Sequence, residues 1–367
     1  MSLPPAKWSS MATARQLIAS KLDTPVRDLV LATTWAQRNP GVRERFRAEL
    51  ATNNATFHVV GTEDGWQCGL FHHPAPCHGT GEPIILVPGL GWNEKTFHAQ
   101  HDRSIVRFLQ ARGHELFILA HRSSAFATPP ANARGFNFDD IVAHDVPAAL
   151  QKIKAISGAK RIHWVGHGIG GQLLIGHLAN DGDVDIASGT LISAATCFQP
   201  LHATAKRAAA VARWMPAHWR IPLQQVQRIL MAASRPAHLV PITRRIEGPL
   251  ARGLMTEGVE DLAIGVLRQV AAWHEVGSLV SHDNRFDYVE ALAGRNVPLF
   301  TIAAPDDPLC QPEHAHAILE TIAEGVGKKL TLPDGWAHLD PLAGADAARV
   351  VFPQIASWTH EHNLRCW

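Results

Sequence analysis

Short runs dominated by apolar residues alternate with helical patterns through most of the chain, and this alternation restricts the possible folds more than any other feature. The runs occupy residues 84–87, 116–119, 162–165, 186–193 and 299–303, and a further strand candidate covers residues 329–332. Such runs are typical of strands that are buried on both faces of a parallel sheet. Apolar residues at helical spacing separate them. The sequence therefore predicts an α/β protein with a doubly wound, mostly parallel sheet.

Three segments depart from this alternation and define the expected domains. Residues 1–55 carry helical patterns and are expected to form an N-terminal helical segment. Residues 198–287 also carry helical patterns only, between two strands, which predicts a helical cap inserted over the sheet. The core then comprises residues 56–197 and 288–367, and it begins with two strand candidates on either side of a turn at residues 63–65.

Composition and charge exclude several classes of protein. The 367 residues are 46% hydrophobic, which suffices for a large buried core. The formal net charge of +1 argues against a broad nucleic-acid surface. We find no apolar stretch long enough to span a bilayer and no signal-peptide pattern at the N-terminus. Nothing in the sequence indicates an oligomeric state.

The cysteines and histidines do not group as metal or disulfide sites. The five cysteines are odd in number and widely spaced, which predicts reduced thiols and a cytoplasmic location. His72 with His73, and His314 with His316, could suggest a metal site, but no third ligand is evident. We therefore expect neither a metal nor another cofactor.

The most informative local motif is residues 162–171, which read as a strand, a tight glycine-rich turn and a helix. Gly166, Gly168 and Gly170 have the spacing of the G-x-S-x-G nucleophile elbow, with Gly168 at the position of the nucleophile. Small residues flank the nucleophile in such an elbow because the turn is too tight for side chains. Two alternatives are a phosphate-binding loop, whose register fits poorly, and an ordinary strand–helix turn.

The loop at residues 87–92 follows the first parallel strand. In a fold with a nucleophile elbow, this loop supplies one backbone N–H of the oxyanion hole, and the residue after the nucleophile supplies the other. The predicted donors are Leu90 and Ile169. Rigid backbone donors can stabilise charge that develops on a carbonyl oxygen. Taken alone, the loop could equally be a simple glycine turn.

Two later loops could complete a catalytic triad. Asp307 lies just past the strand at residues 299–303, with Asp306 as the alternative acid, although such a pair is also common in solvated turns. His338 lies in the loop after the last strand, where a general base is expected. The chain order of nucleophile, acid and histidine is that of α/β-hydrolases.

These motifs resemble α/β-hydrolases of the lipase and polyhydroxyalkanoate-synthase neighbourhood, and especially the hydrolase-like region attached to some cholesterol-oxidase-type proteins. The similar stretches are residues 87–91, 104–109, 113–117, 121–124, 138–141, 145–149 and 335–340. The resemblance spans residues 83–358 without the cap and implies the α/β-hydrolase fold. Pro88 replaces the usual histidine of the oxyanion loop. The family nucleophile, serine in lipases and cysteine in the synthases, falls on Gly168.

Three functions are compatible with these features. The first is a carboxylic ester hydrolase or acyltransferase that lacks its nucleophile at Gly168 and is therefore inactive. The second is a non-catalytic ligand-binding protein on a hydrolase scaffold, and the third is a non-covalent catalyst that uses His338. The expected ligand is a small apolar ester or acid, and we expect Trp92, Trp336 and His167 to contact it.

Overall fold

The computed structural model describes residues 55–76, 81–99, 103–201, 203–225, 243–246 and 248–363. Except for Ala55, the predicted N-terminal helical segment lies outside the described residues, as do Cys77 and Cys366. The three described cysteines, Cys68, Cys197 and Cys310, are free thiols. Within the described ranges, no helix has both the length and the apolar character needed to cross a bilayer.

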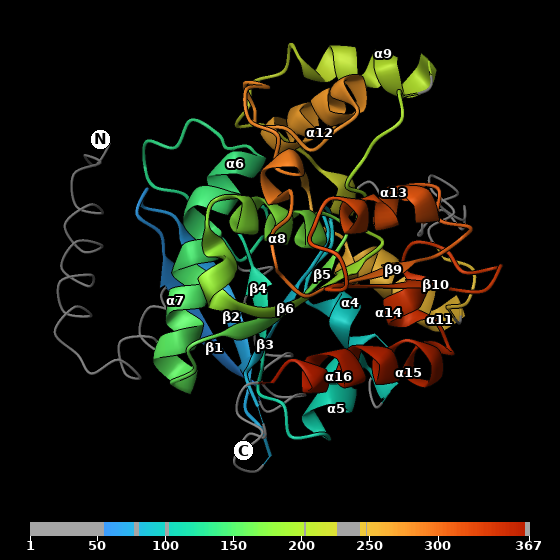
Figure 1. Cartoon of the computed structure of the whole chain (residues 1–367). Helices are drawn as coiled ribbons and strands as arrows, with labels where there is room; N and C mark the ends of the chain where they lie inside the picture. Colours follow the sequence, from blue (N-terminus) through green and yellow to red (C-terminus); the bar gives the residue numbers. More distant parts are fainter. Residues whose placement is uncertain are drawn as a thin grey trace, which may run out of the picture.

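The core is one eight-stranded sheet in the order β1-β2-β4-β3-β5-β6-β9-β10 (Figure 1). The strands are β1 (Thr56–Gly61), β2 (Gln67–His73), β3 (Ile84–Val87), β4 (Leu116–Ala120), β5 (Ile162–His167), β6 (Ile186–Ile192), β9 (Leu299–Ala303) and β10 (Gly327–Thr331). β1 pairs with β2 and β2 with β4 in the antiparallel sense, and all other neighbours are parallel. The predicted doubly wound, mostly parallel sheet is confirmed.

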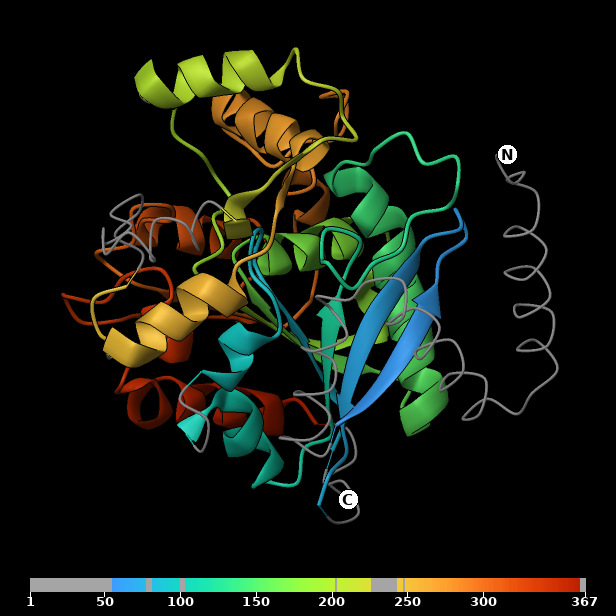
Figure 2. The same ribbon diagram turned by 180° about the vertical axis from the view of Figure 1, so that it is seen from behind.

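Helices cover both faces of this sheet (Figures 1 and 2). They are α4 (Lys95–His98), α5 (Ile105–Gln110), α6 (Phe138–Asp140), α7 (Val146–Ser157), α8 (Ile169–Ala179), α13 (Pro312–His316), α14 (Asp340–Ala343), α15 (Ala347–Val350) and α16 (Phe352–Glu361). A π-helical turn, Ile141–Asp145, joins α6 to α7.

Successive residues of the central strands pack into two different cores. Ile85 and Val87 of β3 belong to a cluster with side chains of α7 and α8, whereas Ile84 and Leu86 belong to a cluster with side chains of α5 and α16. All residues of β3, β4, β5, β6 and β9 are buried. This two-sided burial explains the short apolar runs of the sequence, because each face of a strand needs apolar residues.

Most of the chain between β6 and β9 belongs to the predicted cap, residues 198–287. It contains α9 (Ala203–Ala212), β7 (Arg220–Ile221), α11 (Gly248–Gly253), β8 (Leu262–Ala263) and α12 (Ile264–Val276). The expectation of helices alone was wrong, since β7 and β8 pair as a two-stranded antiparallel sheet. Each of these strands has two residues, too few for a pattern of period two. Figure 2 shows α9 and α12 together at the end of the molecule above the core. The cap boundaries at residues 198 and 287 stay a prediction.

Buried histidines make the fold sensitive to acid. Burial lowers the pKa of His114, His121 and His163 to about 4 and that of His167 to about 3. In the unfolded chain each would bind a proton near pH 6.5. At these four histidines the unfolded state therefore binds more protons than the folded state between about pH 6.5 and 4, so we expect their contribution to stability to decrease as the pH falls through that range.

We expect the free energy of unfolding, measured by urea denaturation at fixed temperature, to fall steadily from pH 7 to pH 4.5. The variant His114→Leu removes one of the titrating groups and should give a shallower decrease. A free energy of unfolding that stays constant or rises toward pH 4.5 would contradict the neutral, buried state of these histidines.

Candidate active site

The turn between β5 and α8 contains three glycines with different steric surroundings. A Cβ atom added to Gly166 would lie 2.3 Å from the carbonyl oxygen of Gly170, and one added to Gly170 would lie 2.1 Å from that of Val87. Both positions therefore require glycine. This is the physical cause of the spacing of small residues in the sequence: the backbones of β5, of the turn and of the end of β3 are in direct contact.

Gly168 differs from its two neighbours because it has room for a side chain. Its φ of 50° and ψ of −123° are uncommon for residues other than glycine. A Cβ atom there would meet its nearest neighbours, Gly89 Cα and His338 Nε2, at 3.7 Å, which is ordinary van der Waals contact. The Gly168 N–H donates to the Ile192 carbonyl at 2.9 Å, which anchors the turn on β6. A side chain at this position would thus face the His338 ring.

His338 forms a buried pair with Asp307. His338 Nδ1 lies 2.7 Å from Asp307 Oδ2, and the N–H groups of Leu309 and Cys310 donate to Asp307 Oδ1 at 2.8 and 3.1 Å. Burial alone would raise the pKa of Asp307, but His338 and the two backbone donors keep it below the usual value. An ionised Asp307 accepts from Nδ1–H of His338. In the neutral ring, Nε2 is then an acceptor that faces position 168.

Asp306 lies apart from this pair. Its carboxylate contacts the guanidinium of Arg244 at 2.9 Å, and its N–H donates to the Trp336 carbonyl. Of the two candidate acids, the structure brings Asp307 to His338.

The loop that carries His338 is held by a buried carboxylate that the sequence analysis missed. Asp340 accepts from the Ala337 N–H at 2.8 Å, from the Thr243 hydroxyl at 2.7 Å and from the Arg244 and Arg245 N–H groups. The same carboxylate thus ties the His338 loop to residues 243–245. The partners lie almost a hundred positions apart in the chain, so no local signal could have revealed the contact.

The predicted oxyanion donors lie beside position 168. Ile169 is the first residue of α8, and N–H groups in the first turn of a helix have no acceptor within the helix. Leu90 lies in a turn that the Trp92 N–H closes by donating to the Gly89 carbonyl at 3.1 Å. Leu90, Gly168, Ile169 and His338 all line one cavity. The donor role of the two N–H groups stays a prediction.

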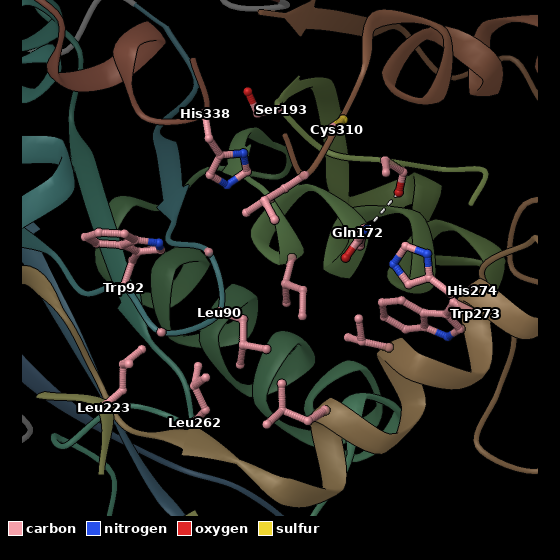
Figure 3. A pocket seen from close by; sticks show the side chains of 18 of the residues that line it. Leu90, Trp92, Gln172, Ser193, Leu223, Leu262, Trp273, His274, Cys310 and His338 are labelled. Carbon is pink, nitrogen blue, oxygen red and sulfur yellow. Dashed lines mark hydrogen bonds between the residues drawn. The ribbon is translucent and has the colours of Figure 1, made fainter. Parts of the chain in front are cut away.

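This cavity has a volume of about 400 Å³ and largely apolar walls. Trp92 lines it as expected, and α12 contributes Leu267, Val270 and Trp273. Figure 3 shows Trp273 and His274 on one side of the cavity and His338 on another. The polar side chains of Gln172 and Ser193 also lie on its wall, although the sequence analysis did not single them out.

Two expected ligand contacts do not lie on this wall. Trp336 is 1% exposed and packs in the core cluster that contains α16, with the Arg245 guanidinium 5.1 Å from the centre of its ring. His167 is fully buried, and its Nε2 lies 3.1 Å from the His338 carbonyl, to which it donates because a carbonyl oxygen only accepts. Burial lowers the pKa of His167 to about 3, so the ring is neutral. Neither residue lines the cavity: Trp336 packs in the core, and His167 contacts His338.

No group of three or more histidine, cysteine, aspartate or glutamate side chains within the described ranges could hold a metal ion. The cavity combines the His338 imidazole, which is paired with Asp307, with a largely apolar wall.

Comparisons with known proteins identify the family. Residues 84–354 match the sequence model of the "Alpha/beta hydrolase family". The chain is also 28% identical over 114 residues to the poly(3-hydroxyalkanoate) polymerase subunit PhaC of Cupriavidus necator. That match spans 30% of this chain and only 18% of the polymerase subunit.

Solved structures of the same fold include a thermophilic esterase from Thermogutta terrifontis and a putative lipase from Acinetobacter baumannii. The TM-score is 0.57 for the esterase, at 15% identity over 84% of this chain and 100% of that one. It is 0.59 for the putative lipase, at 12% identity over 87% and 95% of the two chains. Identities this low show a shared fold alone. With the family match over most of its length, the sheet order and the β5–α8 turn, the chain belongs to the α/β-hydrolase family.

Proposed function

We propose that the cavity is the acyl site of a carboxylic ester hydrolase in which Gly168 leaves no covalent nucleophile, so that this chain binds an apolar ester or acid without consuming it efficiently. The observation that carries this proposal is the geometry at position 168. A Cβ atom there would lie 3.7 Å from His338 Nε2, and Asp307 holds the opposite nitrogen of that ring.

Each group has a role in acyl transfer that its position supports. A hydroxyl or thiol at position 168 would attack the ester carbonyl while His338 took its proton, and His338 would return that proton to the leaving alcohol. The N–H groups of Leu90 and Ile169 would stabilise the oxyanion. With glycine, the attacking atom is missing while the base, its carboxylate and the backbone donors remain.

The apolar wall predicts how binding depends on the ligand. Each additional buried CH₂ group contributes roughly 0.8 kcal/mol, so affinity should rise about fourfold per carbon until the cavity is full. The net charge of +1 offers little long-range attraction, so raising the salt concentration should change affinity little. Calorimetry with methyl esters of increasing acyl length at two salt concentrations measures both dependences.

Two substitutions on α12 provide the variant and its matched control. Leu267 lines the cavity, whereas Val276 is 51% exposed at the end of the same helix. Leu267→Ala should weaken the binding of long esters more than that of short ones, and Val276→Ala should leave both unchanged. Affinity that ignores acyl length and falls steeply with salt would rule out the apolar acyl site.

A second candidate is direct hydrolysis by water, with His338 as the general base. It is favoured by the same geometry, because Nε2 of His338 faces the space that a side chain at position 168 would occupy. If this function is correct, the unmodified chain already hydrolyses esters. A variant with a serine or cysteine at position 168 should then be little faster.

A further inference from the structure

Two buried polar atoms on the cavity wall lack a hydrogen-bond partner among the described residues. They are Oε1 of Gln172, whose residue is 5% exposed, and Oγ of Ser193, whose residue is 1% exposed. Both residues line the cavity that holds Gly168 and His338. Because buried polar groups in folded proteins nearly always have a partner, each atom calls for an explanation.

The orientation of the Gln172 amide is set by one contact. Gln172 lies on α8, four residues after Gly168, and its Nε2 donates to the Ala195 carbonyl at 2.7 Å. A carbonyl can only accept, so the amide nitrogen must point toward it and the amide oxygen must point away. Figure 3 shows this bond and the oxygen turned from it. An amide oxygen only accepts, so the group that satisfies it has to be a donor.

The backbone of Ser193 is in a strained conformation. Ser193 follows the last residue of β6 with a φ of 49°, which is uncommon for a residue other than glycine. Its N–H donates to the Ile302 carbonyl at 2.9 Å, which ties this strained residue to β9. Strain of this kind persists where the surrounding structure holds it, and it is concentrated at functional sites. Ser193 and Gln172 both line the cavity, so both residues point to it as a ligand site.

We infer that the cavity selects an ester or acid that carries a hydrogen-bond donor, a hydroxyl or an amide N–H, bound to Gln172 Oε1. A purely apolar ligand would leave the buried Gln172 oxygen unpaired, and sites built to hydrogen-bond a ligand discriminate against analogues that lack the group. The inference rests on the proposed acyl site and specifies its ligand.

Calorimetry on the unmodified chain tests this selectivity. The probes are methyl octanoate, the set of its monohydroxylated derivatives, one oxo derivative whose added group can only accept a hydrogen bond, and one derivative with an amide N–H in the acyl chain. At least one of the hydroxylated or amide derivatives should bind about tenfold more tightly than methyl octanoate. The oxo derivative should show no such gain. Whether the hydroxyl or the amide gives the larger gain identifies the donor.

Variants assign the selectivity to the named atoms. Gln172→Leu should reduce the preference to about onefold while methyl octanoate still binds. Leu267→Ala is the matched control, since it should weaken all probes by a similar factor and keep the preference. Equal binding of all probes to the unmodified chain overturns this inference but leaves the acyl site intact. If none of the probes binds, both this inference and the proposed acyl site are overturned. A preference that survives in folded Gln172→Leu overturns the assignment to Gln172, and the comparison on the unmodified chain stands even if that variant does not fold.

Discussion

Gly168→Ser is expected to raise kcat/KM for a short acyl ester by at least a factor of about 10³, because removing the serine of a triad costs several orders of magnitude in rate. The backbone at position 168 already has a positive φ, as the strained turn of a nucleophile elbow requires, and the new Cβ would meet its nearest neighbours at 3.7 Å. The φ of 50° should cost roughly 1–3 kcal/mol of stability with any side chain other than hydrogen.

Gly168→Ala is the matched control for this experiment. It introduces the same Cβ atom and the same backbone strain but no nucleophile, so it should be as unstable as Gly168→Ser and as inactive as the original chain. Gly168→Cys should gain activity as the serine variant does. If neither gains activity on any acyl ester, the acyl-transfer site is refuted. If the original chain is already as fast, and loses that rate in His338→Ala, direct hydrolysis by water is the better account.

In the Gly168→Ser background, Asp307→Asn is expected to lower kcat by a factor on the order of 10⁴, the loss typical when the triad carboxylate becomes an amide. Asp307 is fully buried and lies 2.7 Å from Nδ1 of His338. An asparagine amide could present its N–H₂ to that nitrogen, which would shift the ring proton to Nε2 and leave no base facing position 168.

The neighbouring carboxylate provides the control. Asp306→Asn in the same background removes only an ion pair with Arg244, whose side chain is 56% exposed, so kcat should change by no more than a few fold. Initial rates with one chromogenic ester measure both variants. The opposite ranking would transfer the role of the acid to Asp306 and contradict the pair seen in the structure.

The sequence predicted the strands of the core well because their burial is recorded locally. β3, for example, is bounded as expected at residues 84 and 87, since both of its faces are buried and a proline lies directly before and after it, at Pro83 and Pro88. The β5–α8 turn could be predicted for a similar reason. Its glycines are required by backbone contacts within a few residues and with the adjacent loop, and their spacing is visible in the sequence.

Features that depend on distant contacts could not be predicted. The sequence does not distinguish Trp336, which packs in the core, from Trp92, which lines the cavity. Gln172 reads as an ordinary residue of a helix, and its importance arises only because the Ala195 carbonyl orients its amide. The positive φ of Ser193 is likewise not indicated by its neighbours in the chain.

The most direct test of the central claim, that only the attacking atom is missing from an acyl site, is covalent labelling by a serine-directed phosphonate followed by mass spectrometry. Gly168→Ser should acquire one adduct at position 168, and the additional change His338→Ala should abolish it. The original chain and Gly168→Ala should remain unlabelled under the same conditions. A folded Gly168→Ser variant that stays unlabelled, or an adduct elsewhere in the original chain, for example on Ser193, would contradict the account.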